Sequence, residues 1–95
     1  MELVLCRFMS NGEVWYQLQT PAFTKTAQTL PGALEHVEVC FPDLKTLQGA
    51  ATGTVTFVLP RSVRWRGQTY EPIALDEEEC ALVLRFLSRL AGLVF

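Results

Sequence analysis

The segment RSVRWRG, residues 61–67, concentrates basic and aromatic side chains. Arg61, Arg64 and Arg66 are three of the eight basic residues in the chain, and Trp65 among them is one of two tryptophans. Arginine side chains bind phosphate groups, and an aromatic ring beside them can stack on a base. The segment is therefore a candidate patch for nucleic acid or another anionic ligand.

The alternation of side chains gives this segment a second interpretation. On a strand over residues 62–66, Arg64 and Arg66 would project from one face, and Trp65 would point to the other face and help to fill the core. The arginines would then lie on a solvated surface and pair with carboxylates such as Glu71 across a hairpin. We favour this structural role and keep anion binding as the alternative.

His36, the single histidine, lies four positions before Cys40. On a helix these two side chains would be neighbours and could form a nucleophile and its base. The alternating apolar residues of HVEVCF instead predict a strand over residues 36–41. A strand would separate the two side chains by about 13 Å. We therefore expect no catalytic dyad.

No other constellation in the sequence predicts chemistry. The three cysteines, Cys6, Cys40 and Cys80, are isolated and lack the paired spacing of a metal site. The small-residue stretch at residues 49–54 lacks the lysine of a phosphate-binding loop and leads into a predicted strand. We expect no catalytic residues, no metal and no cofactor, and hence a protein that is not an enzyme.

The clearest element is a C-terminal helix that begins after Asp76 and runs towards Phe95. Asp76 is a good N-cap, and Glu79 three positions later completes the pattern of a capping box. The helix carries an apolar stripe broad enough to seat it on a sheet. This stripe consists of Cys80, Val83, Leu84, Leu87, Leu90, Ala91 and Val94.

A second apolar stripe, formed by Leu82, Phe86 and Leu93, lies beside the first. Two explanations stay open: the connection at residues 21–34 folds over this stripe, or a second helix from another copy or partner packs on it. The predicted interface is Leu82, Phe86, Leu93 and the neighbouring Arg89. Attachment of this helix to a membrane surface is a third option, which the acidic residues at its start disfavour.

The remaining elements are predicted from alternation and turn residues. Asn11-Gly12 predicts a hairpin turn, and Val14, Tyr16 and Leu18 are expected on one face of the returning strand. Residues 21–32 are expected to be irregular, with at most a short helical turn. The other predictions are strands over residues 2–8, 13–20, 36–41, 54–59, 62–66 and 69–75, a short helix over 42–49, and a turn at residues 67–68.

These elements predict one domain over residues 1–95 with an α+β fold. We expect an antiparallel meander of four to six strands, strongly curled or barrel-like, with the C-terminal helix packed on it. A fully closed small β-barrel with an appended helix is the alternative. Apolar residues make up 49% and charged residues 19% of the chain, so some apolar surface is expected to need a partner.

The composition also limits the function. A formal net charge of −2 gives no overall attraction to nucleic acid or anionic lipid. No stretch has the length and apolarity of a membrane-spanning helix, and isolated cysteines without a signal peptide favour the cytoplasm. We expect a cytoplasmic interaction module, such as an adaptor or a regulatory or accessory subunit, that forms a homodimer through the C-terminal helix. Nucleic-acid or anionic-ligand binding through Arg61, Arg64 and Arg66 is the alternative.

Overall fold

The computed structural model describes residues 2–93 and has an α+β fold with two sheets. The predicted positions of Val94 and Phe95 at the end of the last helix lie outside the described residues. The strands are β1 (Glu2–Ser10), β2 (Glu13–Gln19), β3 (Thr24–Ala27), β4 (Thr56–Val58), β5 (Val63–Trp65) and β6 (Gln68–Tyr70). The helices are α1 (Leu30–Ala33), α2 (Leu44–Gly49) and α3 (Glu77–Leu90), with a 3-10 turn η1 (Val37–Cys40) and a π turn η2 (Ala50–Thr54).

The main sheet is mixed and open, with the strand order β3-β2-β1-β4. The predicted meander is wrong because β4 pairs with β1 in parallel, at Glu2–Thr56, Leu3–Phe57 and Val4–Val58. A parallel pair needs a long crossover, and the segment between β3 and β4 supplies one that contains α1, η1, α2 and η2. The sheet ends at β3 and β4, so it is neither a barrel nor strongly curled.

The hairpin of β1 and β2 is confirmed. Asn11 and Gly12 have φ values of 52° and 77°, as a two-residue turn of this type requires. Leu18 is fully buried and Tyr16 packs against the main core, whereas Val14 at the open end of the hairpin is 39% exposed. The face formed by Val14, Tyr16 and Leu18 is therefore buried at Leu18 and becomes exposed towards the turn.

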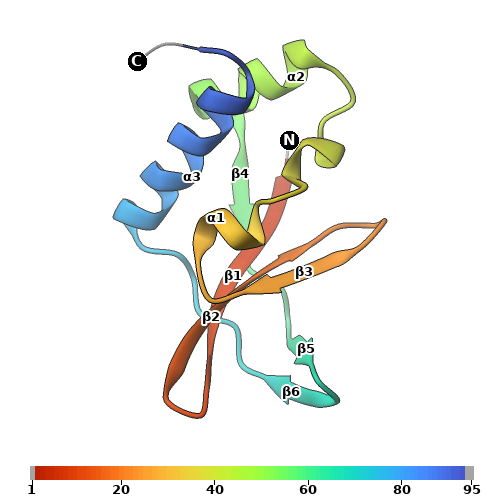
Figure 1. Ribbon diagram of the computed structural model, residues 1–95, viewed down its shortest axis with the longest axis vertical. Helices are drawn as coiled ribbons and strands as arrows, with labels where there is room; N and C mark the ends of the chain where they lie inside the picture. The colour runs from red at the N-terminus through yellow and green to blue at the C-terminus, as the bar shows by residue number, and fades with distance from the viewer. Residues whose placement is uncertain (1, 94–95) are drawn as a thin grey trace.

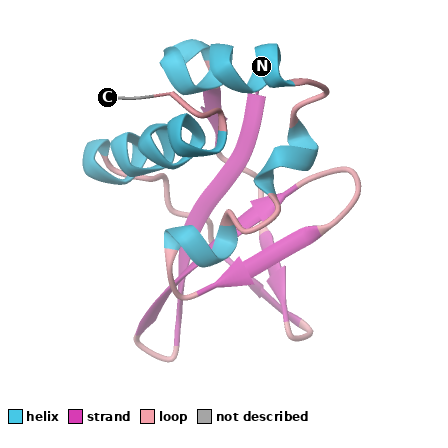
Figure 2. Cartoon of the chain, turned by 45° about the horizontal axis from the view of Figure 1, so that its top comes forward, coloured by secondary structure: helices cyan, strands magenta, loops and turns pink. Residues whose placement is uncertain are grey.

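The two faces of the sheet carry separate cores, and the molecule has three layers. Leu3, Leu5 and Leu18 face the helices and belong to the larger core. Cys6 and Phe8 face the second sheet, β5–β6, and form a smaller core with Val63. Figures 1 and 2 show the helices around the upper half of β1, with the turns of the β1–β2 and β5–β6 hairpins at the lower end.

The segment at residues 21–41 differs most from the prediction. It contains strand β3, which pairs with β2 from Tyr16–Ala27 to Gln19–Thr24. The strand expected over residues 36–41 is wrong, since η1 occupies it. Val37 is buried but Val39 is 58% exposed, so the alternation did not reflect two faces of a strand.

Helix α3 begins as the sequence predicts. The Asp76 side chain accepts a hydrogen bond from the backbone of Glu79, and the Glu79 side chain accepts one from the backbone of Asp76. The helix ends at Leu90, and Gly92 follows with a φ of 73°. This is a common way for a helix to terminate.

Helix α2 and the strand after it match the prediction in part. Asp43 caps α2, and the helix continues through Gly49 into η2, where Gly53 has a φ of 97°. The strand expected over residues 54–59 is shortened to β4, and Leu59 lies beyond its end and is 50% exposed.

Candidate functional site

Of the four residues predicted to form an interface, Leu82, Phe86 and Arg89 lie in α3, whereas Leu93 follows the end of the helix at Leu90. Leu82 is 49% exposed, and Arg89 is also exposed. Phe86 and Leu93 are half-buried and pack against the larger core. The second apolar stripe is therefore partly covered within the chain, and its uncovered part centres on Leu82.

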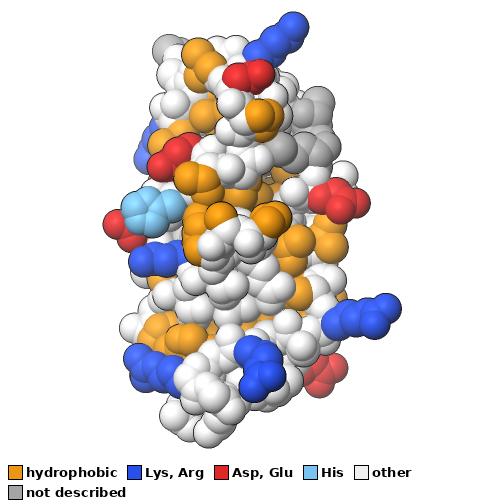
Figure 3. Space-filling model, turned by 90° about the vertical axis from the view of Figure 1, so that its right-hand side faces the viewer, with side chains coloured by type: hydrophobic (Ala, Val, Ile, Leu, Met, Phe, Trp, Pro, Cys, Tyr) orange, Lys and Arg blue, Asp and Glu red, His pale blue; other side chains and the backbone are white. Residues whose placement is uncertain are grey.

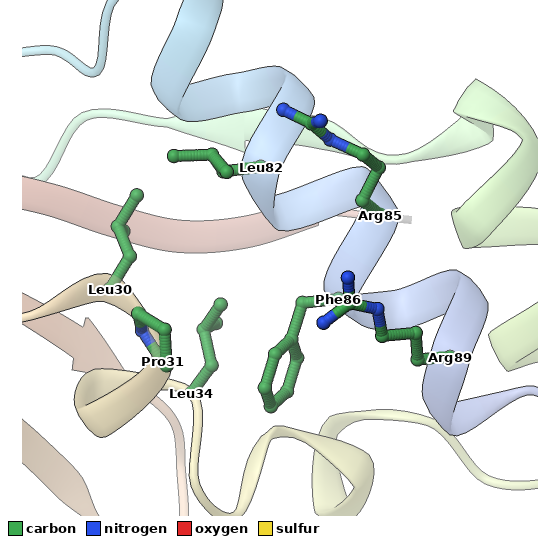
Figure 4. Close-up of a pocket in the computed structure, with 7 residues that line it drawn as sticks. All are labelled: Leu30, Pro31, Leu34, Leu82, Arg85, Phe86 and Arg89. Carbon is green, nitrogen blue, oxygen red and sulfur yellow. The ribbon is translucent and has the colours of Figure 1, made fainter.

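A pocket of about 150 Å³ separates this part of α3 from α1 (Figure 4). On the α1 side, the pocket is lined by Leu30, Pro31 and Leu34. These residues belong to the segment at residues 21–34, which was one of the two expected covers of the second apolar stripe. The pocket exists because α1 lies beside the stripe without reaching over Leu82. Its walls are Leu30, Pro31, Leu34, Leu82, Arg85, Phe86 and Arg89.

Contacts with β3 fix the position of α1. Thr29 caps the helix by accepting a hydrogen bond from the backbone N–H of Gly32. A Cβ atom on Gly32 would lie 2.9 Å from the Cβ of Ala27 in β3, so the helix backbone sits directly on the strand. Leu30 and Leu34 are buried at this contact and anchor α1 to the core.

The charges on α3 are separated along its length. Glu77, Glu78 and Glu79 occupy the first turn, where the helix dipole favours negative charge. Glu79 is bound to Arg7, with Oε1 3.4 Å from a guanidinium nitrogen. Within residues 2–93, neither Glu78 nor Arg89 forms an ion pair. The exposed face of α3 thus has an unpaired acidic end, Leu82 near its middle, and unpaired basic residues from Arg85 to Arg89.

The predicted arginine patch is arranged differently from the expectation. Arg64 lies in β5 and is exposed, but Arg66 lies in the turn, with a φ of 51° followed by 76° at Gly67. The turn expected at residues 67–68 is therefore one residue earlier. This shift removes Arg66 from the strand and places its guanidinium 4.3 Å from the ring centre of Trp65.

The expected pairing of the arginines with Glu71 is absent from the part of the chain that the structure describes. The ion pairs there are Arg7–Glu79 and Lys25–Glu35. Arg61, Arg64 and Arg66 have no carboxylate within 4.0 Å in residues 2–93. On the face shown in Figure 3, basic side chains gather towards the lower end, where Figure 1 places β5 and β6.

Both tryptophans meet at this end of the molecule. The ring centres of Trp15 and Trp65 are 4.2 Å apart, and Phe8 and Tyr70 pack against Trp65 at 5.7 and 6.5 Å. Nothing in the sequence near Trp15 or Trp65 predicts that the two rings meet. Their contact depends on β5–β6 crossing the sheet, where Gln17 donates a hydrogen bond to the backbone carbonyl of Arg64.

His36 directly precedes the η1 turn, and Cys40 is the last residue of this turn. The strand that was expected to separate the two side chains does not form. In the described chain no hydrogen bond joins them, and the His36 ring lies edge-on to Phe23 at 6.4 Å. Burial and the nearby carboxylate of Glu38 raise the pKa of the Cys40 thiol. A raised pKa lowers the thiolate fraction that a nucleophile needs.

Residues 2–93 contain no group of three or more histidine, cysteine, aspartate or glutamate side chains arranged to hold a metal ion. None of the described helices combines the length and apolarity needed to cross a membrane.

Comparisons with protein-family models, with curated proteins and with solved structures find no match to this chain. The geometry of its own surfaces is therefore the basis for a functional proposal.

Proposed function

We propose that this protein is a non-enzymatic interaction module that pairs with a second copy of itself through the outward face of α3. The observation that carries the proposal is the half-exposed Leu82 beside an apolar pocket that α1 leaves open. Burying a leucine fully is worth about 1.5–3 kcal/mol, and half of that remains available to a partner at this position.

The charges of α3 favour a second copy as that partner. Glu78, Leu82, Arg85 and Arg89 follow the spacing i, i+4, i+7 and i+11, which places them along one side of the helix. If two α3 helices cross antiparallel with a twofold axis between residues 83 and 84, Glu78 of each copy lies opposite Arg89 of the other. Leu82 of each copy then packs on the aliphatic part of Arg85, near the axis.

Glu78 and Arg89 cannot pair with each other within one chain. Eleven positions along a helix correspond to about 16 Å. Exposed ion pairs contribute little to affinity, about 0–1 kcal/mol each, but they set the orientation of a contact. We therefore expect a weak, concentration-dependent dimer in which Leu82 and Phe86 supply affinity, and Glu78 and Arg89 supply direction.

Mass measured by light scattering across a concentration series tests this proposal. The wild-type mass should rise from monomer to dimer, and Leu82→Glu should remain monomeric. Leu44→Glu is the matched control because Leu44 is 57% exposed on α2 and does not line the pocket beside Leu82. A wild-type chain that stays monomeric at high concentration, or equal effects of both substitutions, would contradict the proposal.

We propose that the protein acts in the cytoplasm as an adaptor or a regulatory or accessory subunit. Cys6, Cys40 and Cys80 are all free thiols, which fits a reducing compartment. Fractionation of cells that express the native protein checks the location.

A further inference from the structure

A second pocket, of about 310 Å³, lies between the turn of the β1–β2 hairpin and the turn of the β5–β6 hairpin. It is on the opposite side of the sheet from the α1–α3 pocket and is more polar. The side chains that line it are Ser10, Asn11, Glu13, Trp15, Trp65, Arg66, Gln68 and Tyr70.

Arg66 occupies an unusual backbone conformation at the edge of this pocket. The two hairpin turns have almost the same geometry, with φ values of 52° and 77° at Asn11-Gly12 and 51° and 76° at Arg66-Gly67. Asparagine is favoured at the first of these positions, whereas a positive φ is uncommon for arginine. The fold therefore accepts an unfavourable residue in a turn where asparagine would serve.

The conformation of Arg66 holds its guanidinium against the aromatic cluster. The guanidinium carbon lies 4.3 Å from the ring centre of Trp65 and 6.0 Å from that of Trp15. In the described part of the chain, the Arg66 side chain has no carboxylate within 4.0 Å and donates no hydrogen bond. Stacking thus orients a planar cation while leaving its N–H donors free for a ligand.

We infer that this pocket binds a nucleotide, with a phosphate on Arg66 and the base stacked in the aromatic cluster against Trp15. A guanidinium binds phosphate oxygens through paired N–H groups, and an aromatic ring beside it accepts a base by stacking. Arg64 in β5 and Arg61 before this strand do not line the pocket, so Arg66 is its basic residue. Duplex binding is not expected, because the site is small and the whole chain has a net charge of −2.

Glu13 adds a negative charge to the wall of the pocket, opposite in sign to that of Arg66. Its Oε2 atom accepts a hydrogen bond from Gln28 at 2.7 Å, and a carboxylate has further acceptor capacity. A negative group at this wall disfavours a phosphate there and favours the N–H groups of a base. The pocket therefore orients the ligand, with its phosphate towards Arg66 and an N–H edge of its base towards Glu13.

A free mononucleotide and a nucleotide within a single strand share this chemistry. Intrinsic fluorescence reports directly on the site, since the only two tryptophans of the chain, Trp15 and Trp65, both line the pocket. The titrants are guanosine monophosphate, a short single-stranded DNA of mixed sequence, and inorganic phosphate, each at low salt.

We expect the nucleotide or the oligonucleotide to quench the fluorescence with saturation, and added salt to weaken binding of the oligonucleotide. Quenching by both ligands supports a site for a free nucleotide, and quenching by the oligonucleotide alone supports a site for a single strand. No saturable change with either ligand, or a response to inorganic phosphate equal to that of the nucleotide, would overturn the inference.

Arg66→Asn is the decisive variant because asparagine suits the turn and preserves the hairpin. It should weaken binding at least about tenfold through loss of the charged donor. Lys45→Gln removes one positive charge from the exposed surface of α2, away from the residues that line this pocket, and should bind like the wild type. If Arg66→Asn binds normally, or if Lys45→Gln loses as much affinity, the assignment of the phosphate to Arg66 is wrong.

Discussion

Tyr16 and Glu79 are joined by a hydrogen bond of 2.6 Å from the phenol Oη to the carboxylate Oε2. The bond connects β2 to the first turn of α3, across the interface between the sheet and the helix. Arg7 approaches the other oxygen of Glu79 from β1, and its Nε donates a hydrogen bond to the carbonyl of Ala74. Glu79 thus links two central strands to the start of the helix whose outer face we propose as an interface.

Removing the phenol should loosen this link. We expect Tyr16→Phe to lower the free energy of unfolding by about 1–2 kcal/mol, since a hydrogen bond to a carboxylate is stronger than a neutral one. Tyr70→Phe is the matched control, because the Tyr70 oxygen accepts a hydrogen bond of 3.1 Å from the neutral hydroxyl of Ser10. Urea unfolding curves give both values, and a smaller loss for Tyr16→Phe than for the control would contradict the prediction.

The same contact predicts a loss of stability in alkali. Burial, followed by the hydrogen bond and the negative charge of Glu79, raises the pKa of Tyr16 from 10.0 to about 12. The folded state therefore holds the phenol proton more tightly than the unfolded state. The stabilisation is complete below pH 10 and is lost as the pH rises from 10 to 12. Unfolding curves across this range should show a smaller decline for Tyr16→Phe than for the wild type.

The three thiols should differ in reactivity. Cys6 is fully buried, and burial raises its pKa to about 11. Cys40 and Cys80 are only partly buried, although their pKa values are also raised. We expect alkylation of the native protein to modify Cys40 and Cys80 first and Cys6 only on unfolding. Peptide mapping by mass spectrometry after timed alkylation measures the order, and early labelling of Cys6 would show that the smaller core is open.

Gly32 should control the position of α1. A methyl group there would lie 2.9 Å from the Cβ of Ala27 and 3.0 Å from Oγ1 of Thr29. We expect Gly32→Ala to destabilise the fold by about 1–3 kcal/mol, because the helix must move away from β3. Adding Ala27→Gly restores the space, so the double variant should lose less than the sum of the two single losses. Additive losses in thermal unfolding would indicate that the contact is not limiting.

The charges on α3 allow a test by exchange. In the proposed dimer, Glu78→Arg places two basic residues opposite each other at both ends of the contact, and Arg89→Glu places two acidic residues there. Each variant alone should dimerise less than the wild type. An equimolar mixture of the two variants should recover the association, because each then meets its opposite charge. Sedimentation of the mixture and of the separate variants measures this, and a mixture no heavier than its components would exclude the antiparallel arrangement.

Local signals in the sequence predicted local structure well. Asn11-Gly12 indicated the first hairpin, and the Asp76–Glu79 pair indicated the start of α3, because each feature depends on neighbouring residues alone. Residues 36–41 were misassigned because alternating valines also fit a 3-10 turn that buries Val37 and exposes Val39. Strand β3, with the sequence TKTA, was missed because it has no large apolar residue.

Features that depend on distant residues were not predictable in this way. The parallel pairing of β4 with β1 joins Leu3 to Phe57, and nothing near either residue specifies it. For the candidate sites, the sequence indicated Leu82 and the arginines but not the pocket walls contributed by α1 or by Trp15. The turn between β5 and β6 was predicted one residue too late, because Arg-Gly is a weaker turn signal than Asn-Gly.

The central position of β1 affects how the chain can fold during its synthesis. This strand leaves the ribosome before β4, Ile73 and Glu79, with which it pairs in the folded protein. Until α3 emerges, the leucines of the β1–β2 hairpin that this helix later covers are exposed to water. A chain in this state is prone to aggregation. A ribosome-bound chain halted before α3 should therefore be cut readily by proteases, and resistance should appear only once α3 has been released.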